Sequence, residues 1–98
     1  MGNKKVFVVN KSSHNFSAAE KFGKLIPLSE GSMNRYSTNN MHRQFDEILR
    51  DSNEEDYILQ CGLTTMNIIA CSIFAVKHGK LNLLIFKEGE YVERNHVF

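Results

Sequence analysis

The sequence predicts one small, Rossmann-like α/β domain with a mostly parallel sheet. The run Val6–Val9 is apolar on both faces, which is typical of a strand in the middle of a covered sheet. Short apolar segments alternate with helical segments along the rest of the chain, as in parallel sheets with helices on their faces. With 98 residues, 42% of them hydrophobic and 23% charged, the chain can form one modest core. We therefore expect a single three-layer domain over residues 1–98.

The first helix follows the first strand after a polar loop. That loop, Asn10–Ser17, is rich in serine and asparagine. Ser17 and Glu20 have the spacing of a capping box, in which the serine and glutamate side chains bond the free amides of a helix start. Gly23 is a natural helix end. The pattern predicts one or two helical turns between Ser17 and Gly23.

A second strand and a second helix come next. Lys24–Leu28 has strand composition, and Pro27 predicts an edge position because proline has no amide hydrogen to donate. Ser29–Asn40 is a long polar loop. The following segment predicts an amphipathic helix because its apolar residues recur at helical spacing, at Met41, Phe45, Ile48 and Leu49.

The third strand is predicted at Tyr57–Cys61, after an acidic segment, Asp51–Asp56, that we expect to be a solvated turn. Gly62–Met66 predicts a tight turn. The helix predicted at Asn67–His78 is apolar on nearly every side, and we expect it to be covered on most of them.

The chain is predicted to end in a hairpin. Leu81–Phe86 is the fourth strand, Lys87–Glu90 is a turn, and Tyr91–Val92 returns as a short antiparallel strand. Right-handed crossovers favour the strand order second, first, third, fourth, with the antiparallel strand at the edge. The first helix then covers one face and the other two helices cover the opposite face.

This order predicts a ligand site where the chain reverses direction, between the first and third strands. Ligands of such sheets bind outside the carboxyl ends of the strands at this switch point. The loops Asn10–Ser17, Ser29–Asn40 and Cys61–Asn67 are predicted to share that rim. The candidate ligand-binding residues on it are Asn10, Ser12, Ser13, His14, Arg35, Gly62, Thr64, Thr65 and Asn67.

The donors on this rim favour an anionic ligand. The turn at Gly62 leads into a helix start, where the free amides near Thr64 and Thr65 attract phosphate or carboxylate. Arg35 is placed to close over a phosphate with two hydrogen bonds. The plainer alternative is that Thr64 or Thr65 caps the helix and water fills the rest.

Composition excludes several other classes. Twelve basic and eleven acidic residues leave a net charge of +1, so we expect no protein that coats nucleic acid. No His/Cys spacing matches a zinc site, and we expect no metal and no cofactor. Cys61 and Cys71 lie in apolar segments, where thiols are small core side chains. No segment approaches the roughly 20 apolar residues of a membrane span. We expect a cytoplasmic protein, and the oligomeric state is left open.

Two resemblances accompany these patterns. Over most of its length the chain resembles small uncharacterised proteins of Gram-positive bacteria and their phages, through its segments Val8–His14, Leu28–Gly31, Gly62–Asn67 and His78–Phe86. That resemblance implies no activity. Locally, Tyr57–Leu81 is similar to the ligand-reading turn of CRISPR-associated Rossmann-like sensor domains, which bind cyclic oligoadenylates. The second glycine and the lysine of their turn are replaced here by Leu63 and Met66.

Three functional hypotheses follow. The first is a binding module for a nucleotide-like or other anionic, phosphate-bearing small molecule at the switch point. The second is an accessory or inhibitory protein of a phage or mobile element that binds a host or other partner protein, with Ser29–Asn40 as its contact surface. The third is a metal-independent phosphodiesterase in which His14 or a rim serine activates the nucleophile. We favour a binding protein over an enzyme.

Overall fold

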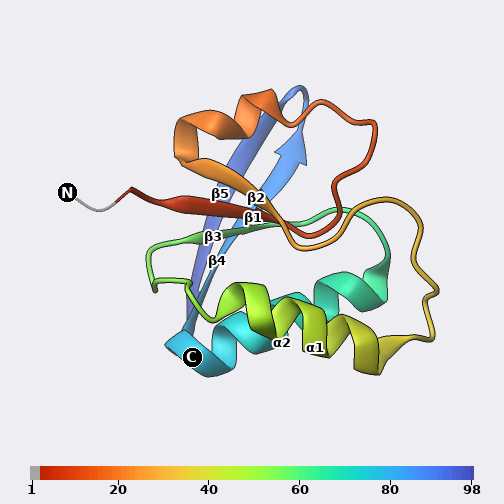
Figure 1. The fold of residues 1–98 in the computed structure, drawn as a ribbon. Helices are drawn as coiled ribbons and strands as arrows, with labels where there is room; N and C mark the ends of the chain where they lie inside the picture. Colours follow the sequence, from red (N-terminus) through yellow and green to blue (C-terminus); the bar gives the residue numbers. More distant parts are fainter. Residues whose placement is uncertain (1–2) are drawn as a thin grey trace.

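The structure is a five-stranded sheet with helices on both faces. The computed structural model describes residues 3–98, so the first two residues of the predicted domain lie outside it. Along the chain (Figure 1) the elements are β1 (Lys5–Val8), η1 (Ser17–Phe22), β2 (Lys24–Pro27), α1 (Thr38–Leu49), β3 (Tyr57–Leu59), α2 (Thr64–His78), β4 (Lys80–Lys87) and β5 (Glu90–Val97). None of the described helices is long and apolar enough to cross a membrane.

The sheet has the predicted order, β2-β1-β3-β4-β5. The first four strands run parallel, and β5 pairs antiparallel with β4. β2 is an edge strand, and Pro27 pairs with Val8 of β1. No strand lies on the other side of β2, so the missing amide hydrogen of Pro27 breaks no sheet hydrogen bond there. The predicted α/β fold class is confirmed.

The hairpin is longer than predicted. β4 and β5 each have eight residues, whereas a return strand of only Tyr91–Val92 was expected. The two residues between them, Glu88 and Gly89, have φ angles of 50° and 85°. Positive φ at both central residues is the geometry of a type I′ turn, whose twist matches that of paired strands. The favourable turn allows the pairing to continue through the polar residues that follow Val92.

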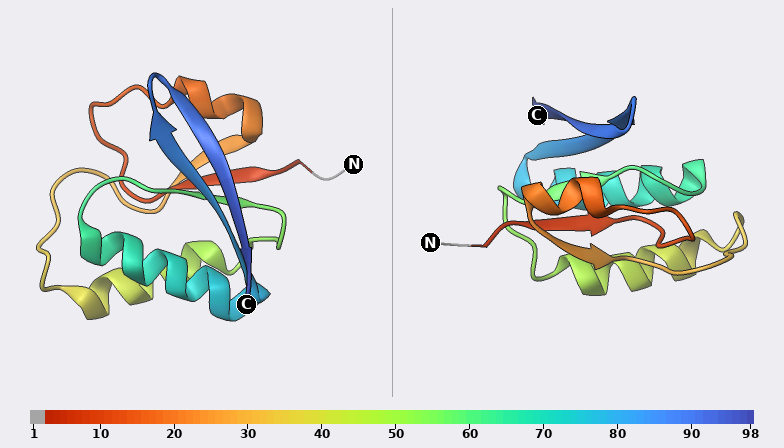
Figure 2. Two further views of the ribbon diagram at one scale, coloured as in Figure 1. Left: turned by 180° about the vertical axis from the view of Figure 1, so that it is seen from behind. Right: turned by 90° about the horizontal axis from the view of Figure 1, so that it is seen from above.

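The sheet separates two layers of unequal size (Figure 2). The 3₁₀ helix η1 packs on one face, and α1 and α2 lie side by side on the other. The side chains of β1 and of Val9, which follows it, alternate between the two layers. Phe7 and Val9 join the cluster under the two α-helices, while Val6 and Val8 join the cluster under η1. All four side chains are buried, which confirms that the first strand is covered on both faces.

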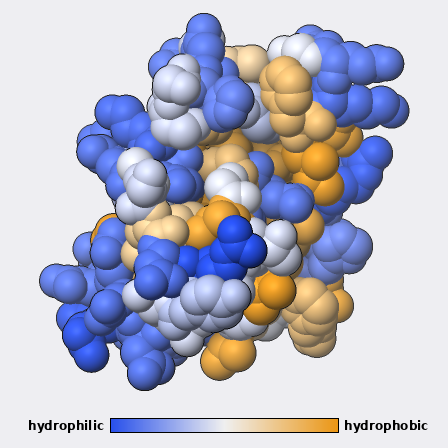
Figure 3. All heavy atoms as spheres, turned by 90° about the vertical axis from the view of Figure 1, so that its right-hand side faces the viewer, coloured by the Kyte–Doolittle hydropathy of each residue, from blue (hydrophilic) through white to orange (hydrophobic). Residues whose placement is uncertain are grey.

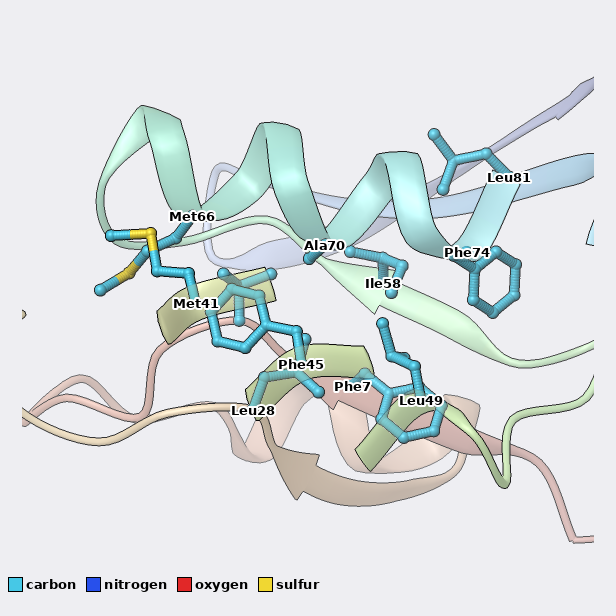
Figure 4. Packing of buried hydrophobic residues seen from close by; sticks show 11 residues of the cluster. Phe7, Leu28, Met41, Phe45, Leu49, Ile58, Met66, Ala70, Phe74 and Leu81 are labelled. Atoms are coloured by element: carbon cyan, nitrogen blue, oxygen red, sulfur yellow. The ribbon is translucent and has the colours of Figure 1, made fainter. Parts of the chain in front are cut away.

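The larger cluster lies between the sheet and the α-helices (Figure 4). Phe45 and Leu49 of α1 and Phe74 of α2 point toward Phe7 and Ile58 of the two central strands. These side chains are fully or almost fully buried. Burying a large apolar side chain contributes about 1.5–3 kcal/mol, so this layer supplies much of the stability of the fold.

The start of η1 differs from the predicted capping box. The Ser17 amide hydrogen bonds to the side chain of Asn15 at 2.8 Å, and the side chain of the N-cap residue, Phe16, bonds no amide of the described helix. The side-chain oxygen of asparagine commonly accepts such a bond from the amide two residues along the chain, and serine does so more weakly. The prediction that Ser17 and Glu20 cap this helix is therefore wrong.

The acidic segment before β3 is not fully solvated. Asp56 is only 1% exposed, and its two carboxylate oxygens accept hydrogen bonds from the backbone amides of Lys5 (2.9 Å) and Asn53 (2.7 Å). The Lys5 ammonium lies 3.6 Å from the same carboxylate. Hydrogen bonds to a charged group contribute about 1.5–3 kcal/mol. Asp56 thus fixes the turn into β3, and its assignment to a solvated turn is wrong.

Helix α2 begins earlier and is covered less than predicted. It starts at Thr64 rather than Asn67. Met66, Ala70 and Phe74 are buried against the sheet and α1. On the outer side, however, Ile68 is 58% exposed and Val76 is 87% exposed. The expectation that this helix is covered on most sides is wrong, because the sheet and α1 reach only part of its circumference.

Removing Phe74 tests the packing of this layer. We expect Phe74→Ala to lower the free energy of unfolding by about 3–5 kcal/mol, because the side chain is fully buried and its loss leaves a cavity. The matched control is Phe98→Ala, since Phe98 is 77% exposed and its loss opens no cavity. Urea unfolding measures both variants. Equal midpoints for Phe74→Ala and the wild type would contradict the packing described here.

Candidate functional site

The three predicted rim loops meet at the carboxyl ends of the strands, on the right of Figure 1. The Lys11 amide donates to the Ser29 carbonyl at 2.8 Å, and the Asn10 side-chain amide donates to the Gly31 carbonyl at 3.0 Å. Asn10 also meets the third loop, because its backbone amide lies 3.4 Å from the Cys61 sulfur. These contacts place Asn10 at the centre of the rim.

Gly62 fits tightly against Asn10. A Cβ at position 62 would lie 2.9 Å from the Cβ of Asn10, and Gly62 has a φ of 83°, which favours glycine. The Oδ1 of Asn10 is buried and has no hydrogen-bond partner among the described residues. A carbonyl oxygen accepts hydrogen bonds, so this atom suits a donor rather than an anion.

Asn67 holds the turn instead of facing a ligand. Its Oδ1 accepts from the Cys61 amide at 3.1 Å, and its Nδ2 donates to the carbonyls of Cys61 (2.9 Å) and Leu63 (2.8 Å). The N-cap of α2 is Leu63, whose side chain bonds no amide of the described helix. The alternative in which Thr64 or Thr65 caps α2 is therefore wrong, and this helix start has no side-chain cap.

The other rim residues stay apart from this turn. Ser12, Ser13, His14 and Arg35 are all exposed. The Ser12 hydroxyl accepts from the His14 amide at 3.3 Å, and the His14 ring meets Phe16 edge to face. The structure thus brings Asn10, Gly62 and Asn67 together with the start of α2, while His14 and Arg35 stand on separate exposed loops.

A serine–histidine contact does occur, at the opposite end of the strands. Ser52 Oγ lies 2.8 Å from His78 Nε2 and donates its hydrogen to the Leu49 carbonyl at 2.6 Å. Ser52 is buried, and the Leu49 carbonyl competes with Nε2 for its single hydroxyl hydrogen. Burial lowers the pKa of His78 below its usual value. The pair joins the turn after α1 to the end of α2.

The largest feature beside the rim is a hollow of about 510 Å³ between α2 and the hairpin. We call it the hairpin hollow, and it is lined by Gln60, Cys61, Gly62, Thr64, Asn67, Ile68, Cys71, Leu83, Ile85 and Phe86. Its polar residues come from the turn before α2 and from the first turn of α2, and its other walls are apolar. Figure 3 looks onto this side of the molecule, where apolar side chains form an irregular band from the upper right to the lower edge.

The two thiols of the hollow are poor nucleophiles. Burial raises the pKa of Cys71 to about 11, and burial also raises that of Cys61. Both sulfurs are therefore protonated at neutral pH, and a protonated thiol reacts slowly. Within residues 3–98, no three His, Cys, Asp or Glu side chains gather as a metal-ligand set.

Sequence reasoning missed the apolar members of the hollow. Ile68 and Phe86 are each 58% exposed, and Ile85 is 38% exposed. From sequence alone, an apolar residue in a helix or a strand is expected to be buried. The exposure of these three side chains was therefore not predicted. The sequence did contain one signal, the uncharged stretch Thr64–Val76. A helix that is apolar on every side needs cover on every side, and a small domain has too few elements to provide it.

Comparison with known proteins gives one result. The family model of the phage Pam3 gp32-like protein matches residues 4–96, nearly the whole chain. No curated protein matches the chain, and no solved structure does. The phage part of the resemblance stated above is confirmed, whereas no match supports the Gram-positive part or the likeness to CRISPR-associated sensor domains. The chain belongs to the phage Pam3 gp32-like protein family.

Proposed function

We propose that this protein is a phage accessory protein that acts by binding another protein, with the hairpin hollow as its contact surface. The observation that carries the proposal is the exposure of Ile68, Ile85 and Phe86 around one apolar hollow. Contiguous exposed apolar surface on a small protein is typical of a protein-binding site, because leaving it in water is unfavourable. Membership of a phage protein family supports the same function.

The backbone beside the hollow favours an extended segment of the partner. β3 pairs with β4 only as far as Leu84. The last hydrogen bond between them runs from the Gln60 amide, just after β3, to the Leu84 carbonyl. The next residues, Ile85–Lys87, pair with β5 on the other side. Backbone groups alternate sides along a strand and the Leu84 carbonyl faces β3, so Phe86 is the next residue of β4 whose amide and carbonyl face the hollow. An extended peptide can pair with such an edge and place apolar side chains in the adjoining hollow.

Photo-crosslinking tests this function. We expect p-benzoylphenylalanine at position 86 to give one specific adduct with a partner protein when the chain is expressed in its phage-infected host, and we expect Ile85→Asp to remove it. The matched control carries the same probe at position 98. Phe98 is also exposed, but it lies at the other end of the hairpin, where its amide bonds the Gly79 carbonyl. Identical adducts from both positions, or none from position 86, would refute the assignment.

A second candidate function is binding of the phosphate-bearing, nucleotide-like ligand predicted from the sequence. Its support is that the uncapped start of α2 opens beside the hollow, with the Thr64 hydroxyl and the Gly62 turn on the hollow's wall. Free amides at a helix start attract phosphate, and the apolar wall beside them suits a base. Asn10, Ser12, Ser13, His14, Arg35 and Thr65 are not among the residues that line this hollow.

Thermal unfolding with added nucleotides tests the second candidate. If the site exists as predicted, a phosphate-bearing compound raises the melting temperature of the wild type, because it binds only the native state. Thr64→Val then reduces the shift, because it removes a hydroxyl from the wall of the hollow, while Arg43→Ala, which removes an exposed arginine of α1, leaves it intact. The absence of any shift at millimolar nucleotide would exclude this function.

A further inference from the structure

A second apolar surface lies on the outer side of the helix layer, apart from the hairpin. A groove of about 440 Å³ runs between α1 and α2, with Leu49, Ile69 and Ile73 in its apolar floor. The α2 residues that border it toward solvent include Ile68, Ser72 and Val76. These three exposed positions are spaced four residues apart, so they form one ridge along the helix. Ridge and groove therefore lie side by side on one face.

We propose that this helix face is the interface of a homodimer, so that the occupant of the groove is a second copy of the chain. A ridge beside a groove on the same helix is complementary to itself. A two-fold axis near Ser72 sets the two α2 helices antiparallel and brings Ile68 of each copy next to Val76 of the other. Two-fold dimers of this kind use the same patch on both subunits.

The charge distribution favours an identical partner. From Thr64 to Val76 the sequence of α2 contains no charged residue, so two copies can meet along it without like-charge repulsion. Ser72 is small and stands at the middle of the ridge, where it lets the two helices approach closely. The charged residues of the groove lie at its border: Asp46 is on α1, Arg50 follows α1, and Lys77 near the end of α2 donates its ammonium hydrogens to the Leu49 and Arg50 carbonyls. An apolar centre with a polar rim is the usual anatomy of a homodimer interface.

A stable dimer needs only a small part of the accessible surface of the molecule. A standard interface takes about 800 Å² from each partner, or about an eighth of the 6221 Å² accessible surface of this molecule. The hairpin hollow opens on the other side of α2 from the groove and shares only Ile68 with it.

The test measures mass in solution as a function of concentration, by light scattering after size exclusion. We expect the wild type to rise from the chain mass of 11.3 kDa to twice that value, and we expect Val76→Asp to remain at the chain mass. Val97→Asp is the matched control, because Val97 is 84% exposed but lies on β5. It should still dimerise. A wild type that stays monomeric at the highest attainable concentration overturns the proposal, as does an equal loss of dimer in both variants.

Disulfide cross-linking tests the same interface in a second way, because it detects the contact between the two copies without disrupting it. In a background with Cys61→Ala and Cys71→Ala, we expect Ser72→Cys to form an intermolecular disulfide on mild oxidation, because the two Ser72 positions meet at the two-fold axis. Val97→Cys should stay uncrosslinked under the same conditions. Cross-linking of Val97→Cys but not of Ser72→Cys would place the contact elsewhere and overturn the proposal.

Discussion

Helix α2 has no polar face, and the rest of the structure depends on this constraint. Its side toward the sheet buries Met66, Ala70 and Phe74 and so covers β3 and β4. The same composition leaves Ile68 and Val76 in solvent, because α1 and the sheet reach only part of the helix. A helix in that position usually carries charged residues outward. Here the outward residues from Thr64 to Val76 are uncharged, and both surfaces assigned to partners lie along them.

The turn before α2 fixes where the helix begins and what opens beside it. Asn67 holds this turn with three hydrogen bonds, and Gly62 lets it approach Asn10 at the centre of the rim. β3 ends at Leu59, whereas β4 continues to Lys87, so the turn and the free part of β4 enclose the hairpin hollow. The hollow thus results from unequal strand lengths at one end of a parallel sheet.

Elements with strong local patterns could be predicted from the sequence. The doubly apolar Val6–Val9 run predicted a central strand, and Pro27 predicted an edge, because both patterns follow from burial and from the missing amide of proline. Side-chain roles that depend on tertiary contacts could not be predicted. In the sequence, Asp56 is one of several acidic residues of a predicted turn. It is buried and hydrogen-bonded only because the fold brings Lys5, which is 51 residues earlier in the sequence, next to it.

The candidate site was predicted only in part, because it too depends on tertiary contacts. Topology placed three loops on one rim, and the structure joins them through Asn10 and Gly62. Sequence reasoning chose polar residues of those loops, because polar side chains are the usual signal of a ligand site. The exposed apolar residues Ile68 and Phe86 carry no such signal, since exposure depends on how far neighbouring elements reach.

The outer face of α2 is exposed at Ile68 and Val76 and is not part of the molecule's own core. Urea unfolding of the double variant Ile68→Ser and Val76→Ser, at a dilution where the wild type is monomeric, tests it most directly. We expect a free energy of unfolding within about 1 kcal/mol of the wild type, because exposed side chains contribute little to stability. A loss of several kcal/mol, as expected for a buried residue, would contradict it.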